Sequence, residues 1–398
     1  MKNQSILLLL ITGLFFANAC SSESPEPKKE DPTQQQPEEK QEDIPAIDDQ
    51  VTSFLQKYGI PGASLAISKG GKLVYKKAFG VANKETNVPV TVDSRFRLAS
   101  LSKTYTGVAI MKLVQDGKFK LDDTVFGEKA LLGTTFGSKA YPENFKKVTV
   151  RQLLQMTSGG FLTESNRDAI DSQQGLDNNA FFNWMMDNSK LAFEPGTNYR
   201  YVNTNFFIAG RIIEKFSGKS FINYVKEDLL KPLGDTSTEL AKRSKAGAYP
   251  NEVTYYGQGG LVGYEYGFNI ERRDADGGIV TTATDVLRFV NAIDGFPSRP
   301  DILNTNSLNL LTTPSTANNS YACGIGLWGD IWYNYGTLPG TRTGFMRHKN
   351  GMAVVLLLNS TKDYFKSEEF DPFVFAMQDV MVDIVSKNTR PYKDIDQF

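Results

Sequence analysis

The sequence predicts an α/β (α+β) fold. Both ends of the chain build one antiparallel sheet flanked by helices, and a mostly helical lobe is inserted at about residues 100–315. Two observations predict this arrangement. Residues 62–80 and 321–360 have strand patterns with short turns between them, whereas the patterns between these stretches are mainly helical. Strands at both ends pack most simply as one sheet covered by the terminal helices.

The amino-terminal part of this domain begins with an amphipathic helix. In residues 47–59 the apolar side chains recur at helical spacing until the chain reaches Gly59. Residues 62–69 and 72–80 then predict two strands, and the Gly70-Gly71 pair between them is typical of a hairpin turn.

The same periodicities predict the elements of the lobe and of the second half of the sheet. The helix after Ser100 has a wide apolar surface and ends at Gly117, and Thr149 is a candidate N-cap for the next helix. Residues 203–234 predict two helices that are separated at Gly218. The remaining elements are a helix within 281–295, strands within 321–336, 340–349 and 352–360, and an amphipathic helix at 371–386.

Composition and charge exclude several classes of function. The chain has 398 residues, with 44 basic and 45 acidic side chains, so it lacks the excess of positive charge that is typical of nucleic-acid-binding proteins. The single histidine, His348, excludes the usual zinc sites, which need several His or Cys ligands. A Gly-x-Gly-x-x-Gly match at residues 324–329 lies in a β-rich run with no helix after it, so it does not predict a dinucleotide site. We expect no metal and no cofactor.

Residues 1–20 have the features of a signal peptide. Lys2 precedes an apolar run at 6–16 that is too short to span a bilayer, and the segment ends in Ala17-Asn18-Ala19-Cys20. This ending resembles the bacterial lipobox, in which the cysteine is lipidated. We therefore expect an exported lipoprotein of the bacterial cell envelope, held at the membrane by a lipid on Cys20 rather than by a transmembrane helix. A plain signal peptide cut near Ala19 is the alternative.

Residues 21–43 differ in composition from the rest of the chain. They contain no aromatic and no aliphatic side chain, so they cannot bury enough apolar surface to offset the entropy of an ordered chain. Their proline and charge content predicts a disordered tether. The folded domain is then residues 44–398. Cys323 is the only cysteine of that domain, so a structural disulfide with Cys20 has no evident purpose.

The stretch from Arg95 to Lys118 contains a candidate nucleophile. A serine hydrolase without a suitable histidine needs another base, and lysine is a known substitute. Ser100 and Lys103 are three residues apart, so a helix would place both on one face, and its N-terminus would favour an oxyanion near Ser100. Burial of Lys103 would favour its neutral amine. Alternatively, Ser100 is a helix N-cap and Lys103 a surface residue.

Other segments carry a resemblance to a known family. Tyr201-Val202-Asn203 stands directly before a helix, and together with FRLASLSKTYTG at 96–107 it strongly resembles the motifs of the serine β-lactamase-like hydrolases. That family includes class C β-lactamases, D-alanyl-D-alanine carboxypeptidases and esterases that share their fold. The resemblance covers about residues 46–360 and implies a β-lactamase/transpeptidase-like fold. Segments that add to it, in the family's order, are 60–83, 148–160, 276–289 and 338–359.

The resemblance also implies roles for individual residues. Ser100 attacks a carbonyl group and becomes acylated, and Lys103 takes part in activating it. Tyr201 moves protons between Ser100, the leaving group and the attacking water. Asn203 forms hydrogen bonds with Lys103 and with a substrate amide or carbonyl.

The third motif of the family is altered in this chain. Relatives carry Lys-Thr-Gly or His-x-Gly, whereas Asn334-Tyr335-Gly336, followed by Thr337, stands here. Gly336 keeps the close backbone approach, and the Thr337 N–H would complete an oxyanion hole with that of Ser100. Arg342-Thr343-Gly344 imitates Lys-Thr-Gly, but it lies so close to the final strand that we treat it as a decoy. The missing cation at Asn334 favours a neutral ester or amide.

Three functions remain open from the sequence. The favoured one is a serine hydrolase that forms an acyl-enzyme on Ser100 and acts on a small ester or an amide or peptide. The second is a cell-wall D,D-carboxypeptidase or a β-lactamase. The third is a catalytically silent binding module tethered to the cell surface. We expect the domain to be a monomer whose partner is a small molecule or a peptide.

Overall fold

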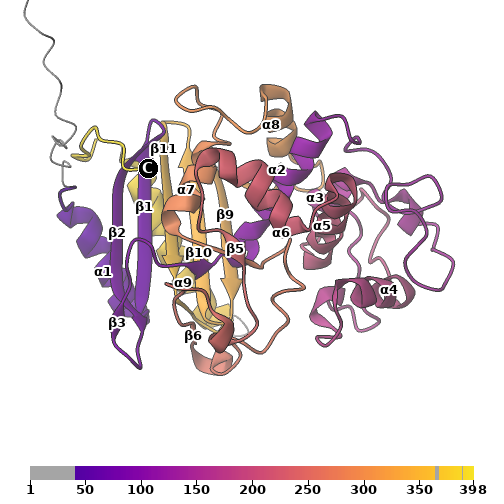
Figure 1. Cartoon of the computed structure of the whole chain (residues 1–398), viewed down its shortest axis with the longest axis horizontal. Helices are drawn as coiled ribbons and strands as arrows, with labels where there is room; N and C mark the ends of the chain where they lie inside the picture. The colour runs from indigo at the N-terminus through magenta and orange to yellow at the C-terminus, as the bar shows by residue number, and fades with distance from the viewer. Residues whose placement is uncertain (1–40, 364–366, 388) are drawn as a thin grey trace, which may run out of the picture. The chain divides into compact units, whose positions relative to one another are not determined.

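A seven-stranded sheet joins the early and the late parts of the chain in the computed structural model (Figure 1). Its order is β3-β2-β1-β11-β10-β9-β8, and every neighbouring pair is antiparallel. Ala63 of β1 lies opposite Leu358 of β11. The prediction of one antiparallel sheet built from both chain ends is therefore confirmed. The strands are β1 Gly62–Lys69, β2 Lys72–Asn83, β3 Val88–Pro89, β8 Gly326–Trp328, β9 Ile331–Leu338, β10 Thr341–His348 and β11 Met352–Leu358.

The structure describes residues 41–363, 367–387 and 389–398. The predicted signal peptide, with Cys20, and residues 21–40 of the predicted tether lie outside the described residues. In the part of the chain that the structure describes, we find no helix that combines the length and the apolar character needed to cross a bilayer.

Helices cover both faces of the sheet, so its central strands are apolar on both sides. In β11 the side chains alternate between the faces, as the pleat of a strand requires. Val354 and Leu356 pack with α1 and α9, whereas Val355 and Leu357 pack on the side of α2 and α7. The helices of these layers are α1 Pro45–Tyr58, α2 Ser102–Gln115, α7 Ala283–Asn291 and α9 Ser367–Ser386.

The inserted lobe is built around α2 and α5, which pack against each other in its core. Gly218 ends α5 in a left-handed conformation, as a helix C-cap commonly does. Thr149 forms a capping box with Gln152 at the start of α3. The helices are α3 Val150–Leu154, α4 Asn178–Asn188, α5 Asn203–Ser217, α6 Phe221–Tyr224 and α8 Thr305–Thr312. Short turns are η1 Ala99–Leu101, η2 Phe145–Lys147, η3 Ala169–Asp171, the π-helical η4 Val225–Leu230, η5 Lys231–Leu233, η6 Lys245–Gly247 and η7 Gly259–Leu261.

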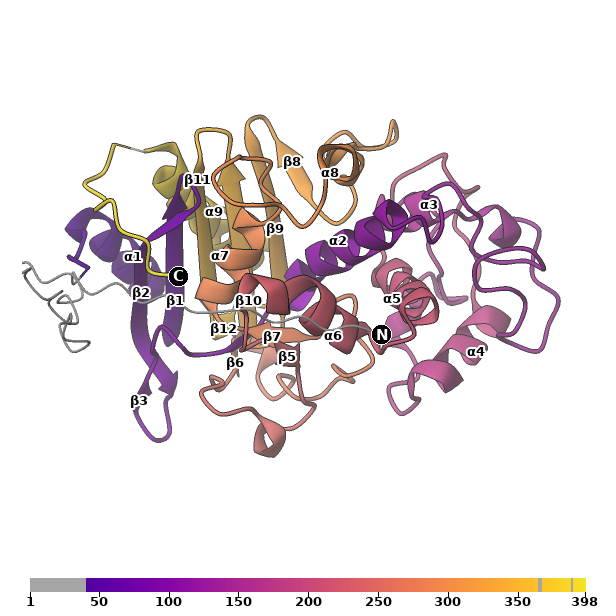
Figure 2. The same ribbon diagram turned by 45° about the horizontal axis from the view of Figure 1, so that its top comes forward.

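The prediction of a mainly helical lobe missed two small sheets (Figure 2). In one, β7 pairs with both β4 and β5, and in the other β6 pairs with β12 in parallel. Each of these strands has only two or three residues, too few to show the alternation on which a strand prediction depends. They are β4 Phe96–Arg97, β5 Glu239–Leu240, β6 Tyr256–Gly257, β7 Ile279–Thr281 and β12 Ser360–Thr361.

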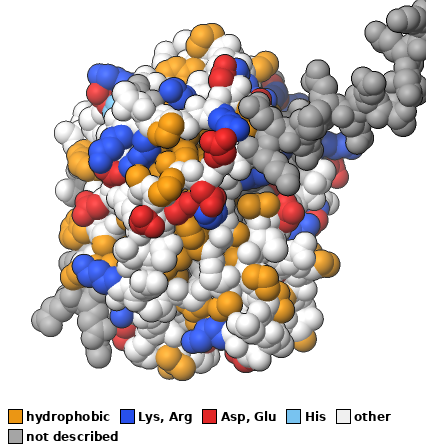
Figure 3. All heavy atoms as spheres, turned by 90° about the vertical axis from the view of Figure 1, so that its left-hand side faces the viewer, with side chains coloured by type: hydrophobic (Ala, Val, Ile, Leu, Met, Phe, Trp, Pro, Cys, Tyr) orange, Lys and Arg blue, Asp and Glu red, His pale blue; other side chains and the backbone are white. Residues whose placement is uncertain are grey.

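The face of the domain that carries α1 and β2 has side chains of mixed character (Figure 3). Basic and acidic groups are interspersed there with hydrophobic ones. This face therefore offers no continuous basic surface of the kind that binds a phosphate backbone.

Cys323 allows a direct test of how the lobe is packed. The residue is fully buried, and burial raises the pKa of its thiol to about 12. We expect Ellman's reagent to leave Cys323 unmodified at pH 8 in the folded protein and to modify it completely in guanidinium chloride. The measurement is the thionitrobenzoate absorbance of a Cys20→Ser chain, in which Cys323 is the single cysteine. Rapid modification without denaturant would contradict the buried position.

Candidate active site

Ser100 lies in the short 3-10 turn η1, which follows β4 and leads directly into α2. Ala99 has a φ of 51°, a left-handed conformation that is uncommon for a residue with a Cβ atom. Such a conformation persists where the surrounding structure holds it, and here β9 lies directly against the turn. Neither η1 nor α2 has a side-chain cap at its start. The structure therefore does not use Ser100 as an N-cap.

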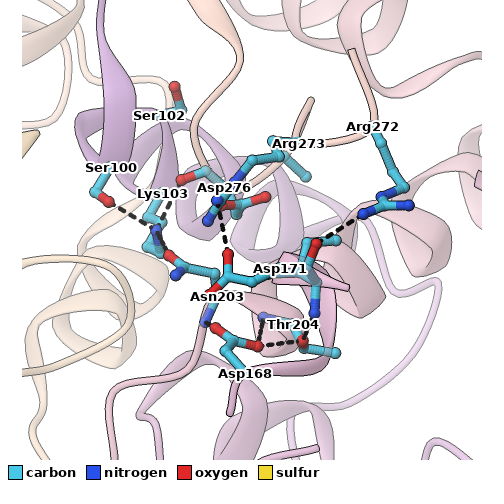
Figure 4. A network of polar contacts seen from close by, with 12 residues as sticks. Ser100, Ser102, Lys103, Asp168, Asp171, Asn203, Thr204, Arg272, Arg273 and Asp276 are labelled. Carbon is cyan, nitrogen blue, oxygen red and sulfur yellow. Dashed lines mark hydrogen bonds and ion pairs between the residues drawn. The ribbon is translucent and has the colours of Figure 1, made fainter. Parts of the chain in front are cut away.

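Lys103 is fully buried, and oxygen atoms from three parts of the chain surround its amino group (Figure 4). Nζ lies 3.0 Å from Ser100 Oγ and 2.8 Å from Asn203 Oδ1. It also lies 2.7 Å from the backbone carbonyl oxygen of Asp276. Three acceptors match the three N–H donors of an ammonium group. The alternative in which Lys103 is a surface residue is therefore wrong.

Asn203 is the first residue of α5, and Asp168 fixes this end of the helix. The Asp168 carboxylate accepts hydrogen bonds from the backbone N–H of Asn203 at 2.5 Å and of Thr204 at 3.3 Å. It also accepts one from the Thr204 hydroxyl. Burial raises the pKa of Asp168 above its usual value, and the charge of Asp171 adds to this effect. No sequence pattern indicated Asp168, because it lies 35 residues before Asn203.

Tyr201 is half-exposed and lies beside the lysine. Lys103 Nζ is 5.0 Å from the centre of the Tyr201 ring, within the range of a cation–π contact. The hydroxyl of Tyr201 makes no hydrogen bond to any described residue. The Tyr201 ring also packs edge-on against Tyr321, at 6.2 Å between centroids. The Tyr321 hydroxyl is buried without a partner among the described residues, and burial raises its pKa well above the usual value.

The altered third motif lies on β9, beside the turn that holds Ser100. The Asn334 amide points into the protein, where Nδ2 donates to Thr104 Oγ1 at 2.9 Å and to the Gly324 carbonyl at 3.1 Å. A third contact, of 3.3 Å, reaches the Ser100 carbonyl oxygen. Asn334 therefore ties β9 to the start of α2, and its side chain is not free to bind a substrate.

Gly336 is the closest point between β9 and η1. A Cβ atom at this position would lie 2.0 Å from the Leu98 carbonyl oxygen and 2.9 Å from Ala99 Cβ. β8 pairs with β9 only at residues 331–333. At Thr337 this edge of β9 therefore faces the turn that holds Ser100 instead of another strand.

One cavity of about 540 Å³ connects these groups. Ser100, Tyr201, Asn203, Asn334 and Thr337 all line it. Its size is typical of a small-molecule site. The structure thus brings together the residues of the three sequence motifs, although two of them do not line the cavity: Lys103 is buried behind Ser100, and Gly336 forms the contact between β9 and η1.

A family model described as beta-lactamase matches residues 47–372, which is most of the chain. The chain belongs to the beta-lactamase family. The β-lactamase-like fold expected from the sequence is therefore confirmed, and the family is one of serine hydrolases.

Relatives within and around this family differ in length and in what they do. Protein flp of Staphylococcus aureus is 28% identical over 328 residues, which cover 80% of this chain but 63% of that protein. D-amino acid amidase from Ochrobactrum anthropi SV3 superposes with a TM-score of 0.67 at 24% identity, covering 87% and 99% of the two chains. An octameric penicillin-binding protein homologue from Pyrococcus abyssi gives 0.67 at 22% identity, covering 88% and 80%. The two structures show the shared fold.

Arg342 is a further residue of the cavity wall. It lies on β10 opposite Thr337 of β9, lines the cavity, and donates to the Thr337 hydroxyl. Its guanidinium is 4.7 Å from the centre of the Tyr335 ring, and burial lowers its pKa to about 10. Asn334-Tyr335-Gly336 lies on β9 beside the turn that holds Ser100, whereas Arg342-Thr343-Gly344 lies on the next strand, β10, as expected for a decoy of the third motif. The register of the hairpin nevertheless brings this cation into the cavity wall.

The segment at Asp276 supplies contacts that no sequence motif indicated. Its carbonyl holds Lys103, and its carboxylate pairs with Arg273 at 2.9 Å. Arg273 also pairs with Asp171 at 3.1 Å. Burial lowers the pKa of Arg273, but the charges of Asp276 and Asp171 outweigh this and raise it above the usual value. Lys103 and Asp171 are distant from this segment in sequence, so only the fold reveals their contacts with it.

Gly336 allows a test of the contact between β9 and η1. We expect Gly336→Ala to lower the free energy of unfolding by about 1–3 kcal/mol, because the new methyl group forces the two elements apart. The same shift should slow covalent labelling of Ser100 by a fluorophosphonate at least about tenfold. Denaturant titration and intact mass against time measure the two effects.

The matched control is Gly175→Ala, since a Cβ atom there meets nothing within 4 Å. Equal behaviour of the two variants would contradict the close approach.

Proposed function

We propose that this chain is a serine hydrolase that forms an acyl-enzyme on Ser100 and acts on a small ester or on an amide or peptide. The observation that carries the proposal is the 3.0 Å contact between the Ser100 hydroxyl and the fully buried amine of Lys103. A lysine removed from solvent and placed against a serine oxygen, at the wall of a cavity, is the arrangement that activates a nucleophile.

Acylation follows from the positions of three groups. Ser100 Oγ attacks the carbonyl carbon of the substrate, and the carbonyl oxygen takes up the negative charge. Lys103 stabilises the developing alkoxide and, with Tyr201, forms the proton-transfer pair. The proton of Oγ passes through this pair to the leaving group, because Tyr201 is open to the cavity while Lys103 is not.

The remaining steps use the same groups. The backbone N–H groups of Ser100 and Thr337 stabilise the oxyanion, one from the first turn of a helical segment and one from the uncovered edge of β9. In deacylation a water molecule occupies the place of the leaving group and attacks the acyl carbon, while its proton passes through the pair of Tyr201 and Lys103 toward Ser100 Oγ. The bond between the acyl carbon and Oγ then breaks, and Ser100 regains its proton.

A cell-wall D,D-carboxypeptidase or β-lactamase is the second candidate, and Arg342 is the observation that favours it. Substrates of those enzymes carry a carboxylate, and the cation that the third motif lacks at Asn334 is present one strand away. Arg342 faces Thr337 in the cavity wall, where a guanidinium could bind a carboxylate in bidentate fashion. A catalytically silent binding module remains the third candidate.

The test is intact-mass analysis of the protein after incubation with a fluorophosphonate and, separately, with a labelled penicillin. We expect the fluorophosphonate to add to the wild type, and Ser100→Ala to abolish the addition. Lys103→Met and Tyr201→Phe should slow it by about 10²- to 10⁴-fold, because each removes a proton-transfer group. Lys112→Met, on the same helix, is the matched control and should react normally.

The reagents also separate the candidates. Addition of the fluorophosphonate alone supports an esterase or amidase. Addition of both reagents supports the D,D-carboxypeptidase or β-lactamase. A folded wild type that neither reagent modifies would leave only the silent module.

We also propose that residues 1–20 direct export, that Cys20 is lipidated, and that residues 21–43 tether the domain 44–398 to a membrane of the bacterial cell envelope. The support is the short apolar run at 6–16, the small residues before Cys20, and the charge-rich composition that follows.

Lipidation has its own test in cells that export the full chain. We expect the wild type to incorporate radiolabelled palmitate and to sediment with membranes, and Cys20→Ser to do neither. Membrane association is expected because acyl chains bury apolar surface that this segment otherwise lacks. A Cys20→Ser protein that still carries the label would rule out Cys20 as the lipid site.

A further inference from the structure

A second cavity lies directly beside the catalytic one. Its volume is about 590 Å³, and Asp171, Arg273 and Leu338 line both cavities. These three residues therefore form a wall with one cavity on each side. Figure 4 shows Asp171 and Arg273 of this wall next to the Lys103 network.

The far side of the second cavity is built from the segment 257–268. Leu261, Tyr264, Gly267 and Phe268 of this segment line the cavity. Leu261 is fully buried and anchors the segment, whereas the side chain of Tyr264 is 62% exposed. A large aromatic side chain on an anchored segment, at the edge of a cavity, offers apolar surface to a ligand.

Hydrogen bonds hold this segment in place. The Gly257 N–H donates to the Glu265 carboxylate at 2.7 Å, and the Gly260 N–H donates to Asp363 Oδ2 at 2.9 Å. Arg97 donates to the Glu265 carbonyl at 2.7 Å. Because Arg97 lies three residues before Ser100, the segment is fixed relative to the nucleophile. The second cavity is therefore formed before any ligand binds.

Apolar groups, rather than charges, distinguish the second cavity. In the shared wall, Arg273 is paired with Asp171 at 3.1 Å and with Asp276 at 2.9 Å. Arg167 is the other charged lining residue, and it is exposed to solvent. The aromatic rings of Tyr264 and Phe268 remain as the surface against which a ligand would pack.

We propose that the second cavity is a subsite for a remote part of the substrate, and that this part is an aromatic or other apolar group. The substrate of Ser100 is then an extended ester or amide that crosses the wall at Leu338, with its scissile carbonyl in one cavity and the apolar group in the other. This inference rests on the proposed function, because it describes a substrate of the same nucleophile.

Two variants alter the cavity in opposite ways. Gly267→Leu fills it, and a Cβ atom at Gly267 meets only backbone atoms of Tyr264 at 3.5 Å or more, so the fold accommodates the change. Tyr264→Ala removes an exposed part of the wall. Val262→Ala is the matched control, since Val262 is 67% exposed on the same segment and does not line the cavity.

The experiment measures kcat/KM of the full chain for two series of esters. In one series a phenyl group lies at increasing distance from the ester bond on the acyl side, and in the other series it lies on the alcohol side. Acetate esters without the phenyl group are the reference. We expect the kcat/KM of the wild type to be at least about tenfold higher for one of the esters that carry a phenyl group than for the acetate ester. Gly267→Leu and Tyr264→Ala should each reduce this ratio at least about threefold, and Val262→Ala should not.

Three results would overturn the proposal in distinguishable ways. A wild type that hydrolyses acetate and phenyl esters equally well in both series, or a phenyl preference that survives in Gly267→Leu and Tyr264→Ala, would remove the subsite alone. A wild type that hydrolyses no ester and reacts with no fluorophosphonate would remove the proposed function, and the subsite with it.

Discussion

The buried amino group of Lys103 is the interaction on which the rest of the site depends. A buried amine needs hydrogen-bond partners that replace its hydration, and leaving a buried polar group without its partner typically costs about 1–3 kcal/mol. Its three acceptors come from η1, from the first residue of α5, and from the loop before β7. Those elements therefore have to meet around one atom, which places Ser100, Asn203 and Asp276 in fixed relation before a substrate arrives.

Supporting contacts keep each acceptor in position. Asp168 holds the start of α5 through the N–H groups of Asn203 and Thr204, and Arg273 holds the Asp276 carboxylate. On the other side of the nucleophile, Gly336 lets β9 approach the Leu98 carbonyl so closely that no side chain fits between them. The turn that holds Ser100 is thus packed between the main sheet and the lobe, and this packing maintains the left-handed conformation of Ala99.

The sequence was informative where a local pattern determines the structure. Hydrophobic periodicity predicted the long strands β1, β2 and β11 and the helices α2 and α5, and the Ser100 and Tyr201 motifs indicated residues that the structure does bring together. It was silent on Asp168 and on the Asp276 carbonyl, because these contacts join segments that are far apart along the chain. It did not indicate that Arg342 lines the cavity, since this depends on the register between β9 and β10. Two-residue strands such as β4 carry too little periodicity to be predicted.

Asn334 shows how this chain accommodates the loss of the family's cation at the third motif. A lysine at position 334 would carry a positive charge at this place. The asparagine amide instead donates to the Thr104 hydroxyl and the Gly324 carbonyl, so β9 is joined to α2 by neutral hydrogen bonds and no charge is buried unpaired. Arg342 then supplies a cation from β10, where Tyr335 covers one face of the guanidinium. The cavity wall therefore carries a positive charge at Arg342 on β10, opposite Thr337, rather than at position 334.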